Sequence, residues 1–154
     1  MRSTLALAWF LGGCVSSTAE VPAPAYDDFR TQVYPLLLRD CGFARCHGDV
    51  DRFWVIWGPG RTRLDEPGVD PELDPEAALQ PFDLPTDREL WMSYQRTRAA
   101  LTHDEAVVDS PLLRRPLEGR EHGGEDHWGH NLWAEDDPSW QLVARWAAGE
   151  ELDP

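Results

Sequence analysis

The segment CGFARCH at residues 41–47 constrains this chain more than any other, because it brings two thiols and an imidazole together within one short stretch. Two cysteines followed directly by a histidine form the pattern of covalent haem attachment, in which both thiols add to the vinyl groups and the histidine binds the iron. The spacer between the cysteines has four residues instead of the usual two. We therefore expect haem c on Cys41 and Cys46, with His47 as an axial ligand.

The same residues allow two haem-free interpretations. A Cys41–Cys46 disulfide, which an oxidising compartment favours, predicts a binding lipoprotein whose loop rich in Trp and Gly contacts carbohydrate or a partner protein. A zinc site is also chemically sound, with the ligands Cys41, Cys46, His47 and His127. The disulfide leaves the adjoining His47 unexplained, and exported thiolates tend to oxidise, so haem attachment is favoured.

The first fourteen residues predict export and lipidation. A positive start at Arg2 precedes an apolar run at 5–11, and the sequence LGGC ends at Cys14. This segment is too short to span a bilayer and has the pattern of a secretory signal. Its end resembles the lipobox of bacterial lipoproteins, which implies that Cys14 becomes the lipidated N-terminus. Because Val15 follows instead of Asp, we expect a lipid-anchored location on the periplasmic side of the outer membrane.

The chain divides into three regions. Residues 1–13 are expected to be the lipoprotein signal peptide. Residues 14–25 contain the lipidated cysteine and a small, polar, Pro-containing stretch that suits a flexible tether. Residues 26–150 are expected to form one monohaem domain, which is long enough to bury a core.

Acidic residues dominate the charge of the chain. There are 28 Asp and Glu residues against 14 Lys and Arg, which gives a formal net charge of -14. Such a charge argues against nucleic acid as a partner and favours periplasmic redox proteins that present a basic docking face. The sequence contains no nucleophile elbow, HExxH or P-loop pattern, so we do not expect an enzyme.

The predicted fold class is mainly α, with long loops and one short β-hairpin. Apolar residues at helical spacing predict a helix over 29–40, capped by one of the acids at 27–28 and kinked at Pro35. A second helix over 86–102 starts with the capping-box residues Thr86 and Glu89. A third helix over 136–149 has Asp137 as its cap, proline in its first turn and glycine at its end.

Three further segments have distinct compositions. The apolar run RFWVIW at 52–57 predicts a short strand, with 61–64 as its hairpin partner. Residues 65–85 combine acids with prolines and predict an exposed loop. Residues 114–133 are rich in glycine and contain three of the five histidines of the chain, which are His122, His127 and His130.

Several segments together resemble a known family. They are FxxxVxPLL at 29–37, CGFARCHG at 41–48, ELxxSY at 89–94, SPLLRRPL at 110–117, HxGHxxW at 127–133 and WAAG at 146–149. Over residues 26–149 this pattern is similar to small secreted c-type cytochrome domains, which are common in predicted lipoproteins of myxobacteria and related to planctomycete-type cytochromes c. The family tends to show HxGGxxF in the fifth segment, so His130 and Trp133 depart from its pattern.

The resemblance implies a small cytochrome c-like helical domain that binds one covalent haem and transfers single electrons. His127 holds the family-like position and is the first candidate for the distal iron ligand; the alternatives are Met92, His130 and His122. A vacant distal position would make the protein a haem-based gas or redox sensor instead. Arg61 and Arg63 are candidates for neutralising the haem propionates.

Overall fold

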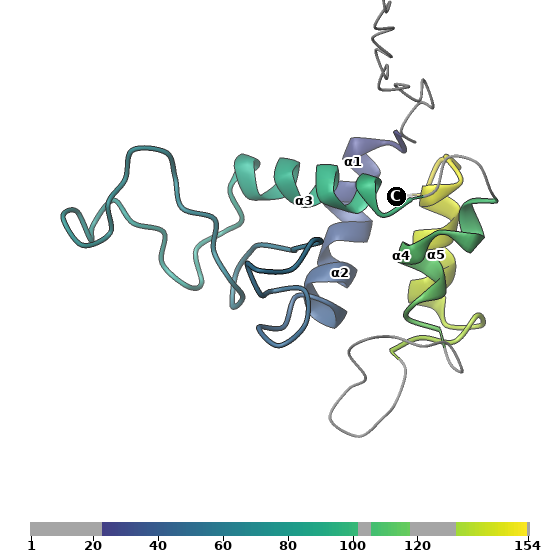
Figure 1. Ribbon diagram of the computed structural model, residues 1–154. Helices are drawn as coiled ribbons and strands as arrows, with labels where there is room; N and C mark the ends of the chain where they lie inside the picture. Colours follow the sequence, from purple (N-terminus) through teal and green to yellow (C-terminus); the bar gives the residue numbers. More distant parts are fainter. Residues whose placement is uncertain (1–22, 102–105, 118–131, 154) are drawn as a thin grey trace, which may run out of the picture.

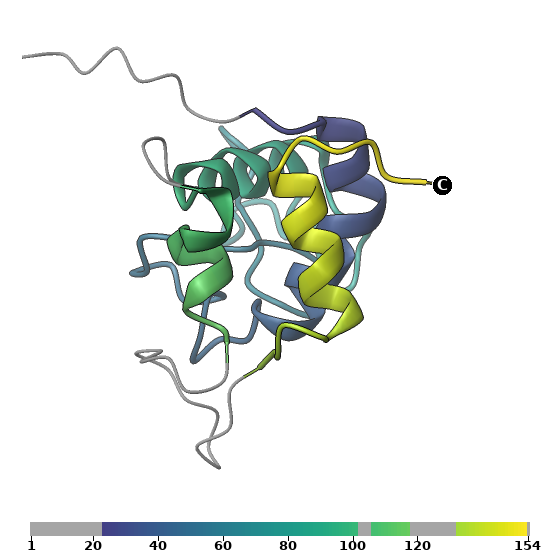
Figure 2. The same cartoon turned by 90° about the vertical axis from the view of Figure 1, so that its right-hand side faces the viewer.

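The computed structural model describes residues 23–101, 106–117 and 132–153, and helices dominate it. They are α1 (Tyr26–Asp28), the π-helical η1 (Phe29–Val33), α2 (Tyr34–Asp40), α3 (Asp87–Ala99), the 3-10 segment η2 (Val107–Asp109), α4 (Pro111–Arg114) and α5 (Pro138–Ala147). In Figure 1, α3 crosses the rod formed by α1, η1 and α2, and in Figure 2, α5 lies between that rod and α4. The predicted mainly α class is confirmed. Among the described helices, none has the length and apolar character to cross a membrane.

The predicted β-hairpin of 52–57 and 61–64 is wrong. The described residues contain no strand, and their one β-bridge, between Leu117 and Trp133, is isolated. Residues 55–58 are instead buried as a single extended segment between the helices. Burial of this segment accounts for the apolar run in the sequence without a pairing strand.

Side chains from two helices bind the backbone of this extended segment. The Tyr34 hydroxyl of α2 donates to the Trp57 carbonyl at 2.8 Å, and the Trp57 N–H donates to the Ser93 hydroxyl of α3 at 3.3 Å. The Ile56 N–H donates to the His47 carbonyl at 2.7 Å. Because these backbone groups are already bonded to helices and to the preceding loop, they do not serve a hairpin ladder.

The first helix is continuous but contains a π-helical turn. The Tyr34 N–H donates to the carbonyl of Phe29, five residues back in the chain. This wider turn directly precedes Pro35, which has no N–H to donate and whose ring crowds the turn before it. The irregularity predicted at Pro35 therefore takes the form of a π-helical turn.

Two of the three predicted helix caps are confirmed. At α3, the Thr86 hydroxyl accepts from the Glu89 N–H at 3.1 Å and the Glu89 carboxylate accepts from the Thr86 N–H at 3.0 Å. At α5, Asp137 accepts from the N–H two residues on at 2.7 Å. The predicted cap of the first helix is wrong, because the helix follows Ala25 without a side-chain cap. The acids at 27–28 lie in its first turn, where they interact favourably with the positive end of the helix dipole.

An aromatic cluster forms the core between the first helix, α3 and α5. The Phe29 ring lies 5.4 Å from the Tyr94 ring and 5.5 Å from the Trp146 ring, measured between centroids. The Tyr94 hydroxyl donates to the Pro24 carbonyl at 2.7 Å, and the Trp146 Nε1–H donates to the Ala25 carbonyl at 2.9 Å. The cluster therefore holds α3 and α5 against the start of the first helix.

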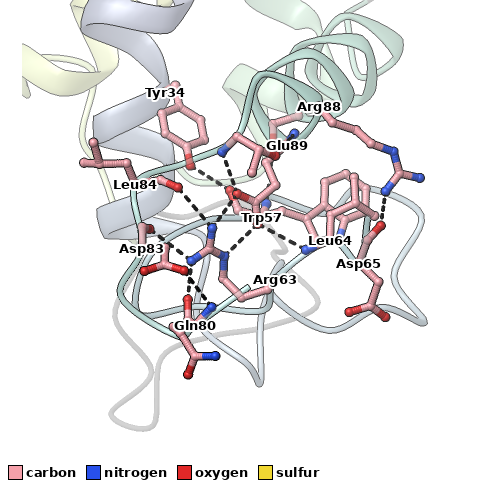
Figure 3. Close-up of polar contacts among 12 residues, drawn as sticks. Tyr34, Trp57, Arg63, Leu64, Asp65, Gln80, Asp83, Leu84, Arg88 and Glu89 are labelled. Carbon is pink, nitrogen blue, oxygen red and sulfur yellow. Dashed lines mark hydrogen bonds and ion pairs between the residues drawn. The ribbon is translucent and has the colours of Figure 1, made fainter. Parts of the chain in front are cut away.

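Residues 65–85 form a series of turns, and the prediction of an exposed loop is confirmed. A buried ion pair between Arg63 and Glu89 holds both ends of this loop (Figure 3). Arg63 Nε and Nη2 bind the two Glu89 carboxylate oxygens at 2.8 and 2.9 Å. Arg63 also donates to the carbonyls of Gln80, Asp83 and Leu84 at 2.5, 3.0 and 3.2 Å. One guanidinium thus joins the beginning of the loop, its end and α3.

Glu89→Gln tests this ion pair. The variant keeps the shape of the side chain but leaves the Arg63 charge without its partner, so we expect the free energy of unfolding at pH 7 to fall by about 3–5 kcal/mol in urea titrations. As a matched control, Glu150→Gln removes the exposed ion pair with Arg145 and should cost less than about 1 kcal/mol. Equal small losses in both variants would contradict a structural role for the buried pair.

The loss of stability in Glu89→Gln should depend on pH. Burial raises the pKa of Glu89, but the hydrogen bonds from Arg63 and from the Thr86 and Leu64 N–H groups outweigh it and hold this pKa below its usual value. Such a carboxylate contributes its stability above the ordinary glutamate pKa of about 4.3, and the contribution is lost as pH falls through the folded-state pKa. The stability difference between wild type and Glu89→Gln should therefore be full at pH 7 and shrink below about pH 4.

Candidate functional site

The CGFARCH motif begins where α2 ends. Cys41 follows the last residue of the helix, and its N–H donates to the Leu37 carbonyl at 2.8 Å. Its side chain is buried in the core beside Leu37. The prediction that the first helix carries Cys41 at its end is confirmed, so a buried element anchors the motif.

The rest of the motif is a compact turn organised by the Phe43 carbonyl. This oxygen accepts hydrogen bonds from the Cys46 N–H at 2.8 Å and from the Gly48 N–H at 2.9 Å. The His47 N–H donates to the Cys41 carbonyl at 2.9 Å. The four-residue spacer therefore folds back on itself and brings His47 beside Cys41.

Cys41 and His47 line a common cavity of about 450 Å³. Its other walls come from Trp54, from the C-terminal end of α3, from α4 and from Trp133. Most of these side chains are apolar. The volume and the lining fall in the range of small-molecule and cofactor sites, about 300–1,000 Å³.

His47 is oriented by Trp54. The His47 Nδ1 atom lies 3.0 Å from the Trp54 carbonyl oxygen. Because a carbonyl can only accept, Nδ1 carries the proton, and Nε2 of the neutral ring carries the lone pair. Trp54 is itself held by α3, since its Nε1–H donates to the Thr97 hydroxyl at 3.1 Å and that hydroxyl donates to the Ser93 carbonyl at 2.8 Å. Hydrogen bonds anchored on α3 therefore set the tautomer of His47.

Among the described residues that line the cavity, the fully charged groups are both cationic. They are Arg52 and Arg115, in a chain with 28 acidic residues against 14 basic ones. Asp40 supports the cavity wall, because its Oδ2 accepts from the Trp133 Nε1–H at 3.1 Å. Burial raises the pKa of Asp40, but hydrogen bonds from Arg39 and Trp133 outweigh it and hold this pKa below its usual value. The described part of the cavity lining thus suits an apolar ligand that carries anionic groups.

Cys41 and Cys46 are both free thiols in different surroundings. Cys46 is half-buried and is not among the residues that line the cavity. Burial raises the pKa of Cys41, and Asp40 and Cys46 raise it further, so this thiol is neutral at physiological pH. In the described part of the chain, no three His, Cys, Asp or Glu side chains are grouped to hold a metal ion. Cys41, Cys46 and His47 therefore do not form three corners of a zinc site.

Most candidates for the distal iron ligand fall in one segment of the chain. His122, His127 and His130, like the expected lipidation site Cys14, lie outside the described residues. Met92 is half-buried on α3 and does not line the cavity, whereas the C-terminal end of the same helix does. Leu132, the first described residue after the histidine-rich segment, also lines the cavity.

Three contributors to the site carry no local signal in the sequence. Trp54 falls in the predicted strand, and Arg52 and Arg115 come together only through the fold. The two arginines considered for the propionates do not line the cavity. Arg63 belongs to the buried ion pair, and Arg61 binds carbonyl groups at the end of α2.

The site combines an apolar cavity, a buried thiol, an oriented imidazole and two guanidinium groups. These features suit an amphipathic ligand that interacts with sulfur and with a nitrogen lone pair and that carries anionic groups. Comparison of the chain with protein-family models, with curated proteins and with solved structures finds no match.

Gly48→Ala tests the packing of the motif turn. A Cβ atom at this position would lie 2.3 Å from the Gly42 carbonyl oxygen and 3.0 Å from the Phe43 backbone, so the turn would have to open. We expect the free energy of unfolding to fall by about 1–3 kcal/mol in urea titrations. Ala44→Ser changes an exposed residue of the same turn and should shift it by less than about 0.5 kcal/mol. Wild-type stability in Gly48→Ala would mean that the turn is open.

Proposed function

We propose that this chain contains a small cytochrome c-like domain that binds one covalent haem and transfers single electrons in the periplasm. The observation that supports it most directly is that Cys41 and His47 line one cavity while the Trp54 carbonyl fixes the His47 tautomer. Histidines that bind metals almost always donate their second ring N–H to a carbonyl, a carboxylate or water. A histidine that follows two haem-binding cysteines is expected to be prepared in this way.

The residues of the cavity have separate tasks in this proposal. When bound, haem supplies an iron centre that takes up and releases one electron. His47 would provide the proximal nitrogen, and its hydrogen bond to Trp54 makes that nitrogen a stronger donor. The apolar walls exclude water and so tune the reduction potential. Arg52 and Arg115 would bind the propionate carboxylates.

Cys41 would hold the haem as a thioether from the cavity wall, and Cys46, which does not line the cavity in the haem-free chain, would have to turn toward it to form the second thioether. A thioether sulfur is neutral and weakly polar, so it is compatible with the burial that raises the pKa of Cys41. In the described part of the chain, Cys41, Cys46 and His47 are not grouped as metal ligands, which favours thioether attachment over a zinc site.

His127 is the first candidate for the distal ligand in this proposal, with Met92, His130 and His122 as alternatives. Glycine at 123, 124 and 129 permits close approach of the backbone to a flat ligand. The position of Met92 away from the cavity wall favours an imidazole. A pair of histidines would give a lower reduction potential than a His–Met pair, which changes the partners that the protein can serve.

The proposal includes a lipid anchor at Cys14 and a tether that keeps the domain on the periplasmic side of the outer membrane. The expected tether of residues 15–25 is too long at its end, because the carbonyls of Pro24 and Ala25 are bound to the aromatic core. Diffusion of the domain is then confined to the membrane surface. The net charge of -14 favours redox partners with a basic docking face. This attraction should weaken as salt screens the charges.

A pyridine haemochrome spectrum tests haem attachment, on protein purified from a host with a maturation system for c-type cytochromes. We expect haem that survives denaturation, with the α band shifted as two thioethers require. Cys41→Ser and Cys46→Ser should each remove one thioether and move the band toward that of haem with a free vinyl group, whereas Ala44→Ser should load normally. A colourless wild type with a Cys41–Cys46 disulfide would replace this proposal with the haem-free binding lipoprotein.

His127→Ala tests the distal ligand in the haem-loaded protein. Loss of a sixth ligand should convert a low-spin spectrum to a high-spin one and shift the reduction potential, and His122→Ala should leave both unchanged. An unchanged His127→Ala spectrum would exclude His127 and direct the same test to Met92 and His130. A wild type that is already five-coordinate and binds carbon monoxide would support the gas sensor.

A further inference from the structure

Arg61 lies outside the motif and binds the end of the helix that precedes it. Its Nε–H donates to the Leu38 carbonyl at 3.2 Å, and its Nη2 donates to the Arg39 carbonyl at 3.4 Å. These carbonyls belong to the last turn of α2, where they lack partners within the helix and where the helix dipole is negative. The guanidinium therefore caps α2 just before Cys41.

The same guanidinium covers the spacer between the two cysteines. The Arg61 Cζ atom lies 4.1 Å from the centroid of the Phe43 ring, in a cation–π contact. The aliphatic part of Arg61 passes over Gly42, where an added Cβ would lie 3.4 Å from the Arg61 Cγ atom. One side chain thus contacts Phe43 of the spacer and the helix end, and it passes close to Gly42.

Phe43 transmits this contact to the residues that carry the chemistry. Its carbonyl accepts from the N–H groups of Cys46 and Gly48, on either side of His47. The residue after Arg61 adds a second link, because the Thr62 hydroxyl donates to the Gly48 carbonyl. A shift of Phe43 would therefore move Cys46 and the backbone of His47.

We propose that Arg61 is the positioning residue of this long spacer and sets the starting conformation from which Cys41 and Cys46 accept haem. Its part in attachment rests on the proposed function, whereas the coupling of α2 to Phe43 is a property of the haem-free chain. In each attachment a thiol adds across a vinyl group, so the sulfur bonds to one carbon, the thiol hydrogen goes to the other, and no oxidant is needed. Arg61 acts on this step only through the loop.

The test compares Arg61→Gln and Arg61→Lys with Arg45→Gln, which removes an exposed arginine from the same loop. In haem-free full-length protein, peptide mass spectrometry measures how fast iodoacetamide alkylates Cys41 and Cys46, beside the urea unfolding midpoint. Arg61→Gln should raise at least one rate about tenfold at native conditions, because loss of the cap and the ring contact opens the loop locally. Lysine lacks the planar fork and should restore the rate only in part. Arg45→Gln should match wild type.

Haem loading gives the second readout, since Arg61→Gln should lower the fraction of chains with covalent haem several-fold in a maturation-competent host. Wild-type alkylation rates in Arg61→Gln would overturn the proposal. If Arg61→Gln fails to fold, Phe43→Leu provides the test, because it removes the aromatic ring while Arg61 keeps its hydrogen bonds to α2. Faster alkylation of Cys46 is then expected, and a wild-type alkylation rate would overturn the proposal. A wild type without haem would overturn the proposed function, while the alkylation rates would still decide the role of Arg61.

Discussion

A row of three polar side chains on α3 organises the site. Glu89, Ser93 and Thr97 follow one another at intervals of one turn, and all three are fully buried. Buried polar groups need hydrogen-bond partners, and each of these binds a different point of the chain between Trp54 and Leu64. The helix thereby supplies hydrogen-bond partners to an extended segment that is not paired with a strand in the described residues. In return, the segment supplies partners to polar side chains of the helix that would otherwise be buried without any.

These hydrogen bonds between α3 and the extended segment determine where the imidazole of the motif lies. Trp54 reaches α3 through its indole N–H and reaches His47 through its carbonyl. Two residues further on, the Ile56 N–H binds the His47 carbonyl, so the histidine is fixed by both its ring and its backbone. The position of His47 therefore follows from the packing of α3, whereas the spacer determines the positions of the two thiols. In the described part of the chain, His47 and the tryptophan that orients it thus lie together in the wall of the cavity.

The sequence predicts those parts of the structure that depend on neighbouring residues. Three predicted features rest on local patterns and are found as expected. They are the capping box of Thr86 and Glu89, the cap at Asp137 and the position of Cys41 at the end of a helix. The hairpin fails because the apolar run is bound by side chains of α2 and α3, which no local pattern reveals. The same holds for the cavity, whose arginines at 52 and 115 meet only through the fold. Glu89 shows the limit most clearly, since its capping role is visible in sequence and its ion pair with a distant arginine is not.

The tautomer of His47 in the haem-free protein tests this account most directly. Long-range ¹H–¹⁵N correlation spectra of the imidazole ring distinguish a proton on Nδ1 from a proton on Nε2. The hydrogen bond to the Trp54 carbonyl requires the proton on Nδ1 in the neutral ring, with the lone pair on Nε2. A neutral ring protonated on Nε2, or a mixture of both forms, would show that the fold does not prepare His47 as a ligand.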